Sequence, residues 1–205
     1  NETFSRTFNV TVTPVNDIPT LNPLSDMTLS EEAPQQPVSL SGITAGGGEN
    51  QPLRVTATSS NTTLIPNPTT TYTSPQATGS IRFTPAANQY GTAVITVTLE
   101  DGGLDSKLST AGDNAIFSRT FTVTVNNIND APSFDAISDL TISEDAPEQT
   151  VNLTGIQAGP FEVQPMRISA SSSNPGLVPN PVVDYTSPNA TGALRLQPAA
   201  DLSGT

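Results

Sequence analysis

The chain has 205 residues and contains no cysteine, histidine or tryptophan. Seven Lys/Arg residues against nineteen Asp/Glu residues give a formal net charge of −12, which argues against binding to nucleic acid or anionic membranes, because both need clustered cations. The lack of Cys and His excludes thiol nucleophiles, Ser–His–Asp triads and structural zinc sites, so we expect no enzyme and no catalytic residue.

The distribution of apolar residues excludes two further classes of protein. No apolar run reaches the ~20 residues that span a bilayer, so we expect no membrane span. Apolar residues are 34% of the chain and alternate with polar ones, which is not typical of a disordered protein. Asn1 begins inside a strand-like pattern, so we expect a segment of a longer protein.

Internal similarity is the strongest feature of the sequence. The run FSRTFNVTVTPVND from Phe4 recurs as FSRTFTVTVNNIND from Phe117, an offset of 113 residues (117 − 4). The runs SEEAP, TYTSPQATGS and AANQYGT recur at the same offset as SEDAP, DYTSPNATGA and AADLSGT. This period is too long for a solenoid, whose units have ~20–45 residues, and suits one folded domain per repeat.

The predicted elements follow this repeat in chain order. Residues 1–16 are predicted to be the last strand of a preceding repeat, residues 17–129 a complete repeat, and residues 130–205 an incomplete second one. Apolar and polar residues alternate over residues 53–58, 81–83, 95–99 and 121–125, which indicates strands with one buried face. About seven short strands per repeat, separated by Pro and Gly, predict an all-β, tandem Greek-key antiparallel β-sandwich.

The joints between repeats are the runs PVNDIP (residues 14–19) and NINDAP (residues 127–132). Proline fixes φ, so these segments should be stiff and extended. Together with SEDAP and with EDGG before the last strand, the xNDxP joint resembles that of bacterial cadherin-like and related immunoglobulin-like tandem repeats of large surface proteins. That resemblance covers the whole chain and implies calcium at the joints.

The resemblance also implies a set of calcium ligands. The ND pairs of the joints, the glutamates of SEEAP and SEDAP, the aspartate of EDGG and the acids of two loops match it: Asn16, Asp17, Glu31, Glu49, Asp101, Asn129, Asp130, Glu144 and Glu162. Pro14 and Asn127 replace the family's linker aspartate, and the DxD pair and the DRE triplet are missing. These departures remove several ligands and leave one ion or none at each joint.

Chemistry independent of the resemblance also favours calcium. Ca²⁺ takes six to eight oxygens from carboxylates, amides and backbone carbonyls, and loops rich in Gly, Asn and Asp supply them. The alternative interpretation is that these acids are solvated turn residues. The connection from Glu100 to Ile116 is long for a hairpin and holds Asp105 and Asp113, so it is either a calcium loop or contact patch, or a mobile surface loop.

The sequence supports two other functions less well. A glycosidase needs two carboxylates ~5–10 Å apart, a condition that nineteen acids meet without specificity. A carbohydrate-binding module would need aromatic platforms, and the tyrosines are only Tyr72, Tyr90 and Tyr185.

We therefore expect an extracellular, cell-surface structural repeat, part of a stalk, adhesin or filament with stiff, calcium-bridged joints. Its partners would be neighbouring repeats, further copies of the chain in a filament, or a cell-surface glycan or protein. The residues 4–13 are Thr-rich and could pair with a neighbouring chain or within their own repeat. A secreted carbohydrate- or protein-binding β-sandwich module is the alternative.

Overall fold

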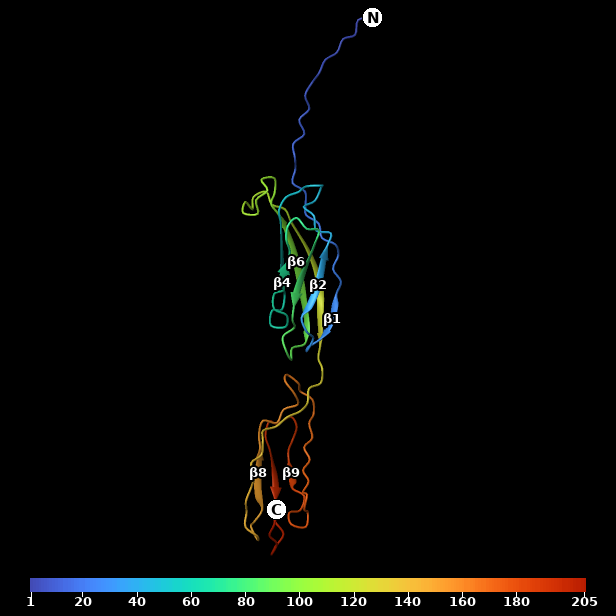
Figure 1. Cartoon of the computed structure of the whole chain (residues 1–205). Coiled ribbons are helices and arrows are strands. Elements are labelled where there is room, and N and C mark those ends of the chain that lie inside the picture. The colour runs from blue at the N-terminus through green and yellow to red at the C-terminus, as the bar shows by residue number, and fades with distance from the viewer. The chain divides into compact units, whose positions relative to one another are not determined.

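A computed structural model describes residues 1–205 and contains strands but no helix, which confirms the predicted all-β class. It therefore has no helix that could cross a bilayer. The chain divides into two compact units, residues 1–127 and 128–205, which we call the first and second unit (Figure 1). The predicted domain limits, 1–16, 17–129 and 130–205, stay predictions.

The first unit is a sandwich of two sheets built from seven strands. The strands are β1 (Met27–Ser30), β2 (Gln36–Ser41), β3 (Leu53–Ser59), β4 (Thr69–Thr71), β5 (Thr78–Phe83), β6 (Gly91–Asp101) and β7 (Ile116–Asn126). One sheet has the order β1-β7-β6-β3 and the other the order β2-β5-β4. All neighbours are antiparallel except β1 and β7, which run parallel.

The core of the first unit follows from the period-2 patterns. In β6 and β7 the residues Ile95, Val97 and Val123 are fully buried, while the Thr residues between them lie on the other face. Ile95 stands opposite Phe121 in the register, so two large apolar side chains share one face of the ladder. The second sheet contributes the buried residues Leu40, Ile81 and Phe83 to the same cluster.

The second unit repeats one of the two sheets. Its strands β8 (Gln149–Leu153), β9 (Val182–Asp184) and β10 (Gly192–Leu196) have the order β8-β10-β9, which matches β2-β5-β4. Loop contacts recur as well: the amide of Leu53 donates to Ser74 Oγ at 2.9 Å, and 113 residues later the amide of Met166 donates to Ser187 Oγ at 2.9 Å. Equal sequences therefore give equal local structure.

The other sheet does not form in the second unit. Residues 140–143 and 166–172 correspond to β1 and β3 but are not strands. In the first unit, β7 and β6 lie between β1 and β3 and supply their hydrogen-bond partners. Residues 128–205 include counterparts of only the first two residues of β6, Gly204 and Thr205, so within this range the two segments have no such partner.

Residues 1–16 also lack a strand (Figure 1). Their apolar side chains are open to solvent, with Phe8 86% and Val12 88% exposed. A β-strand needs a neighbour for its backbone groups, and none lies beside this segment. Its interpretation as the last strand of a preceding repeat stays a prediction.

The β6 register predicts how one strand tolerates substitution. Ile95 is fully buried, whereas its neighbour Val94 is 40% exposed on the other face. We expect Ile95→Ala to lower the free energy of unfolding of the first unit by about 3 kcal/mol through the cavity it leaves. Val94→Ala should cost less than about 1 kcal/mol. Urea unfolding followed by far-UV circular dichroism measures both, and equal costs would contradict this register.

Candidate metal centre

Three segments meet at the end of the first unit where β6 ends and β7 begins. They are the entering segment 14–20, the loop 45–51 and the long loop 102–115 that joins β6 to β7 (Figure 1). Asn16 contacts Gln51, the carboxylate of Asp101 and the backbone carbonyl oxygen of Asp113, and the neighbouring Asn114 contacts Glu100. We call this group the polar cluster; its members are Asn16, Gln51, Asp101, Asp113 and Asn114.

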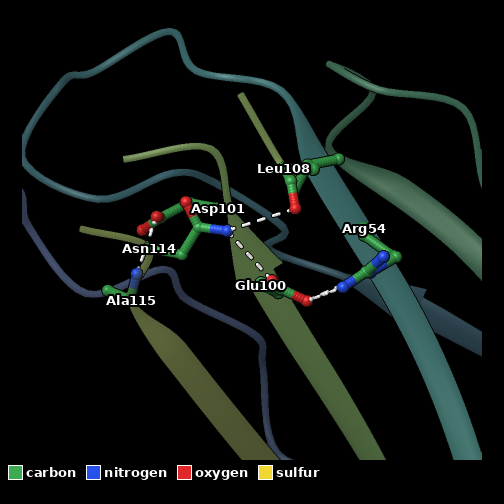
Figure 2. A network of polar contacts seen from close by, with 6 residues as sticks. All are labelled: Arg54, Glu100, Asp101, Leu108, Asn114 and Ala115. Atoms are coloured by element: carbon green, nitrogen blue, oxygen red, sulfur yellow. Dashed lines mark hydrogen bonds and ion pairs between the residues drawn. The ribbon is translucent and has the colours of Figure 1, made fainter. Parts of the chain in front are cut away.

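Asp101 closes the base of the long loop. Its side chain is fully buried at the end of β6, and Oδ1 accepts a hydrogen bond from the amide of Gly103 at 3.0 Å. Oδ1 also accepts one from the amide of Ala115 at 2.8 Å (Figure 2). Amide donors stabilise the charged form of a buried carboxylate, which would otherwise be costly to desolvate. The carboxylate thereby joins the two ends of the loop.

Asn16 connects the entering segment to this carboxylate. Its Nδ2 lies 3.2 and 3.3 Å from the two oxygens of Asp101 and 3.0 Å from the carbonyl oxygen of Asp113. Its Oδ1 accepts a hydrogen bond from Gln51 Nε2 at 2.7 Å. Three acceptor oxygens therefore converge on one point, which the amide nitrogen of Asn16 occupies.

The polar cluster also contains acceptors without partners. Gln51 Oε1, Asp113 Oδ1 and Asn114 Oδ1 are buried and accept no hydrogen bond, and Gln51 is only 7% exposed. A buried polar atom without a partner costs about 1–3 kcal/mol. Carboxylate, amide and carbonyl oxygens are the donor set that Ca²⁺ prefers. The chemistry of the cluster therefore fits a hard cation.

Glycine makes part of this arrangement possible. Gly103 has φ +59°, and a Cβ placed there would lie 2.5 Å from Cγ of Asp113. A side chain at position 103 would therefore displace the Asp113 carboxylate from the cluster. Any other residue would also be strained at this φ.

A carboxylate contact at the start of the unit is repeated in both units. The amide of Asp17 donates to Glu49 Oε2 at 3.1 Å, and the amide of Asp130 donates to Glu162 Oε1 at 3.0 Å. The structure thus brings together four of the predicted ligands as two equivalent pairs. Asn129 differs from Asn16, because its Nδ2 donates to the carbonyl oxygen of Asp130 at 3.1 Å.

The two glutamates predicted near the first strand of each repeat lie elsewhere. Glu31 is buried at the far end of β7, where its amide donates to the carbonyl oxygen of Asn126 at 3.0 Å. Glu144 is exposed in a turn of the second unit. No group of three or more carboxylates lies together in the structure. Amide and carbonyl oxygens would have to complete any cation shell, and the predicted ligand set stays a prediction.

Sequence reasoning missed Gln51 and Asn114. The signal for Gln51 was present, because QPLR at residues 51–54 recurs as QPMR at residues 164–167. Asn114 carried no such signal, since its counterpart would fall beyond residue 205. It lies in the polar cluster only because the long loop folds back beside β6.

Glu100 fixes the long loop from its other side. It forms an ion pair with Arg54 of β3, and its Oε1 accepts a hydrogen bond from Asn114 Nδ2 at 3.0 Å (Figure 2). Asn114 Nδ2 also lies 3.5 Å from the carbonyl oxygen of Leu108. The hydrogen bonds from Asn114 and Arg54, together with the charge of Arg54, lower the pKa of Glu100. The long loop is therefore attached to the sheet by two neighbouring carboxylates, Glu100 and Asp101.

Comparison with known proteins gives a distant likeness. No protein-family model and no curated protein matches the sequence. Among solved structures, the ectodomain of human desmocollin-1 is 14% identical with a TM-score of 0.38, over 93% of this chain and 33% of that one. Titin domains Z1Z2, solved with telethonin, are 10% identical with a TM-score of 0.34, over 91% and 84%. Domains 4–9 of the surface layer protein SbsC are 12% identical with a TM-score of 0.35, over 94% and 28%.

The buried carboxylate yields a first prediction for this site. In Asp101→Asn an amide replaces one oxygen of a group that faces three N–H donors, so we expect a loss of about 2–4 kcal/mol in the free energy of unfolding. Asp105→Asn is the matched control, because Asp105 is exposed in the same loop and needs only one oxygen to accept from the amide of Lys107. Urea unfolding of both variants provides the measurement. Equal stability of the two would show that Asp101 does not hold the loop.

Glu100 yields a prediction about pH. Because its pKa is lowered in the folded protein, its contribution to stability is present above its ordinary value of 4.5 and is lost as pH falls through the folded-state pKa. We expect the unfolding free energy of Glu100→Gln to fall less steeply than that of the wild type between about pH 5 and about pH 3. Parallel urea titrations measure this difference, and identical slopes would refute it.

Proposed function

We propose that the chain is a non-enzymatic, extracellular structural segment, part of a cell-surface stalk, adhesin or filament in which β-sandwich units follow one another. The observation that carries this proposal is the recurrence of the same contact at the start of each unit, the amide of the ND aspartate with a loop glutamate 32 residues later. A repeated contact of the entering chain is what a tandem array needs, because each unit must receive its predecessor in the same way.

The entering segment is held to the first unit on both sides of its ND pair. Asn16 contacts Asp101, and Pro19 is fully buried. Backbone hydrogen bonds of 3.0 and 3.3 Å then join Thr20 to Thr44 as an isolated bridge. Pro14 and Pro19 restrict φ within the same segment. The direction in which the chain enters the sandwich is therefore set by several independent contacts.

We further propose that Ca²⁺ binds the polar cluster. Asp101, Asp113, Gln51 and Asn16 would hold it, with Asp17 and Glu49 as the neighbouring acids. The support is chemical: the cluster holds two carboxylates and the amide oxygens of Gln51 and Asn114, and three of its buried oxygens, one of them Asp113 Oδ1, lack a partner. A bound divalent ion would offset the repulsion between the carboxylates and would give these oxygens a partner. The entering segment and the long loop would then be joined by ion contacts as well as by hydrogen bonds.

The stabilisation that we expect from calcium binding is small but measurable. If free calcium exceeds its dissociation constant tenfold, binding stabilises the folded state by about 1.4 kcal/mol. For a unit of this size, that is a rise of roughly 5 °C in Tm. This stabilisation by calcium would add to that of the hydrogen bonds that already hold the polar cluster together.

Calcium binding is tested by two variants in the long loop. The wild type should show the rise in Tm when EDTA is replaced by ~1 mM Ca²⁺. Asp113→Asn should lose most of the rise, because it removes a carboxylate whose Oδ1 has no partner. Asp105→Asn, with the same change of charge at an exposed position, should keep it. Differential scanning calorimetry measures all three.

Two outcomes would count against the proposal. Equal Tm values of the wild type in Ca²⁺ and in EDTA would refute calcium binding at the polar cluster. A rise in Tm that Asp113→Asn keeps and Asp105→Asn loses would show that calcium binds away from the polar cluster.

A further inference from the structure

The side-chain amide of Asn16 lies among oxygens whose spacing is that of a calcium shell. Its Nδ2 is 3.2 and 3.3 Å from the two carboxylate oxygens of Asp101 and 3.0 Å from the carbonyl oxygen of Asp113. Oxygens that share one Ca²⁺ at ~2.3–2.6 Å, in a shell of about six to eight, lie about 3 Å from one another. An oxygen in the place of Nδ2 would therefore have the spacing of a further member of such a shell.

The orientation of this amide follows from charge. With Nδ2 toward Asp101, the positive end of the amide dipole faces the buried carboxylate, whereas Oδ1 in the same place would be repelled by it. A divalent cation between these oxygens reverses the preference, because its own charge is the largest in the site and attracts each of them. The side chain of Asn16 is therefore favoured in one orientation without a cation and in the opposite one with it.

The orientation of Asn16 also determines that of Gln51. Asn16 Oδ1 faces Gln51, so Gln51 presents Nε2, which donates to it at 2.7 Å. The other end of the Gln51 amide, Oε1, is left buried without a partner, and the residue is only 7% exposed. If Asn16 turned by half a rotation, its Nδ2 would face Gln51 and could donate to that oxygen. The unpartnered oxygen thus points to a second arrangement of the two amides.

The loop leaves room for Gln51 to turn and offers it a second acceptor. A cavity of about 220 Å³, lined in part by Glu49 and Gln51, lies beside the amide. In the second unit, the counterpart of Gln51 makes such a contact: Gln164 Nε2 donates to Glu162 Oε2 at 3.1 Å. Gln51 and Glu49 have the same spacing in the chain. The Glu49 carboxylate is therefore the acceptor that we expect for Gln51 Nε2 once it no longer donates to Asn16.

We propose that Asn16 and Gln51 form a cation-dependent amide switch, an inference that rests on the proposed calcium site. Without a cation, Asn16 Nδ2 holds the carboxylate of Asp101 and the carbonyl group of Asp113 together. When Ca²⁺ binds, both amides turn. Asn16 Oδ1 enters the shell, Asn16 Nδ2 donates to Gln51 Oε1, and Gln51 Nε2 donates to Glu49. The hydrogen bond between the two amides persists with its direction reversed.

The switch has two consequences for the entering segment. The segment stays attached without calcium, because Nδ2 then takes the place of a cation among the oxygens of the cluster. In the bound state, Glu49 accepts hydrogen bonds from Gln51 as well as from the amide of Asp17, so occupancy of the cluster reaches the ND pair. Calcium binding is also weaker than the oxygens alone would give, because the cation has to displace the hydrogen bonds of Nδ2.

The turn of the amides is measured by NMR on the full chain of 21.3 kDa. In EDTA, the side-chain amide hydrogens of Asn16 should show nuclear Overhauser contacts to the amide hydrogen of Ala115, because both groups donate to Asp101 Oδ1. In ~1 mM Ca²⁺ these contacts should be lost, and the side-chain amide signals of Asn16 and Gln51 should shift together. The signals of Asn22, whose Nδ2 donates to Ser41 Oγ outside the cluster, should not move.

The effect of Asn16 on affinity is tested by isothermal titration calorimetry with Ca²⁺ alone. In Asn16→Asp an oxygen faces the cation in either orientation and a charge is added, so Kd should fall at least about tenfold. In EDTA this variant should have a lower Tm than the wild type, because two carboxylates then face each other. Asn50→Asp is the matched control, since it adds the same charge at an exposed position nearby and should change Kd by less than about threefold.

Three results would overturn the switch, and they separate it from the calcium site on which it rests. A Tm that rises in Ca²⁺ while Asn16 keeps its contacts to Ala115 would mean that calcium binds without the turn. A wild type whose Tm and side-chain amide signals both ignore Ca²⁺ would remove the calcium site together with the switch. Equal Kd values of Asn16→Asp and Asn50→Asp would mean that the side chain of Asn16 does not face the cation.

Discussion

The first unit depends on the ladder between β6 and β7. These two strands are the longest in the chain and lie at the centre of their sheet, with β3 and β1 on their outer edges. Their inward residues, among them Ile95, Val97, Phe121 and Val123, are at most 2% exposed. The register of this ladder ends at Glu100 and Ile116, next to Asp101, so the same pairing that fills the core places the carboxylate that closes the long loop.

Residues 128–205 include no counterpart of this ladder beyond Gly204 and Thr205. The sequence of the second unit is closely similar to that of the first unit over residues 128–205, and β8-β10-β9 forms with the same order as β2-β5-β4. The segments equivalent to β1 and β3 do not form strands. They have the same alternation of apolar residues, so propensity and pattern are not sufficient. A strand at the edge of a sheet forms only when a neighbour offers it a row of hydrogen-bond partners.

The sequence predicted the class and the strand periodicity, because alternation at period 2 is a local property. The alternation over residues 53–58 and 95–99 became β3 and β6, with the expected residues buried. The sequence did not predict the parallel pairing of β1 with β7, since Met27 and Val123 are far apart in the chain and either direction of pairing satisfies the pattern. Residues 1–16 form no strand in the structure, and their interpretation as the last strand of a preceding repeat stays a prediction.

The sequence predicted the acidic residues of the candidate site but not the residues whose side-chain amides complete it. The ND pairs and the glutamates Glu49 and Glu162 stand in repeated runs, and the structure pairs them as repeats. The contact of Asn16 with Asp101 depends on the β6–β7 ladder, so no local pattern reveals it. Residues 128–205 contain no counterpart of Asp101, and Asn129 Nδ2 donates to the carbonyl oxygen of the adjacent Asp130. The ND motif therefore does not assemble the polar cluster by itself.

The choice of a carboxylate at position 101 follows from the connections it makes. A buried charge is expensive, and a buried polar group contributes little to stability compared with an apolar one of the same shape. Asp101 nevertheless joins the two ends of the long loop to Asn16 of the entering segment. An apolar residue could fill the same volume, but it would leave the amides of Gly103 and Ala115 without partners and the entering segment without its contact to the sheet. The buried charge is thus explained by the contacts that it makes to both ends of the long loop and to the entering segment.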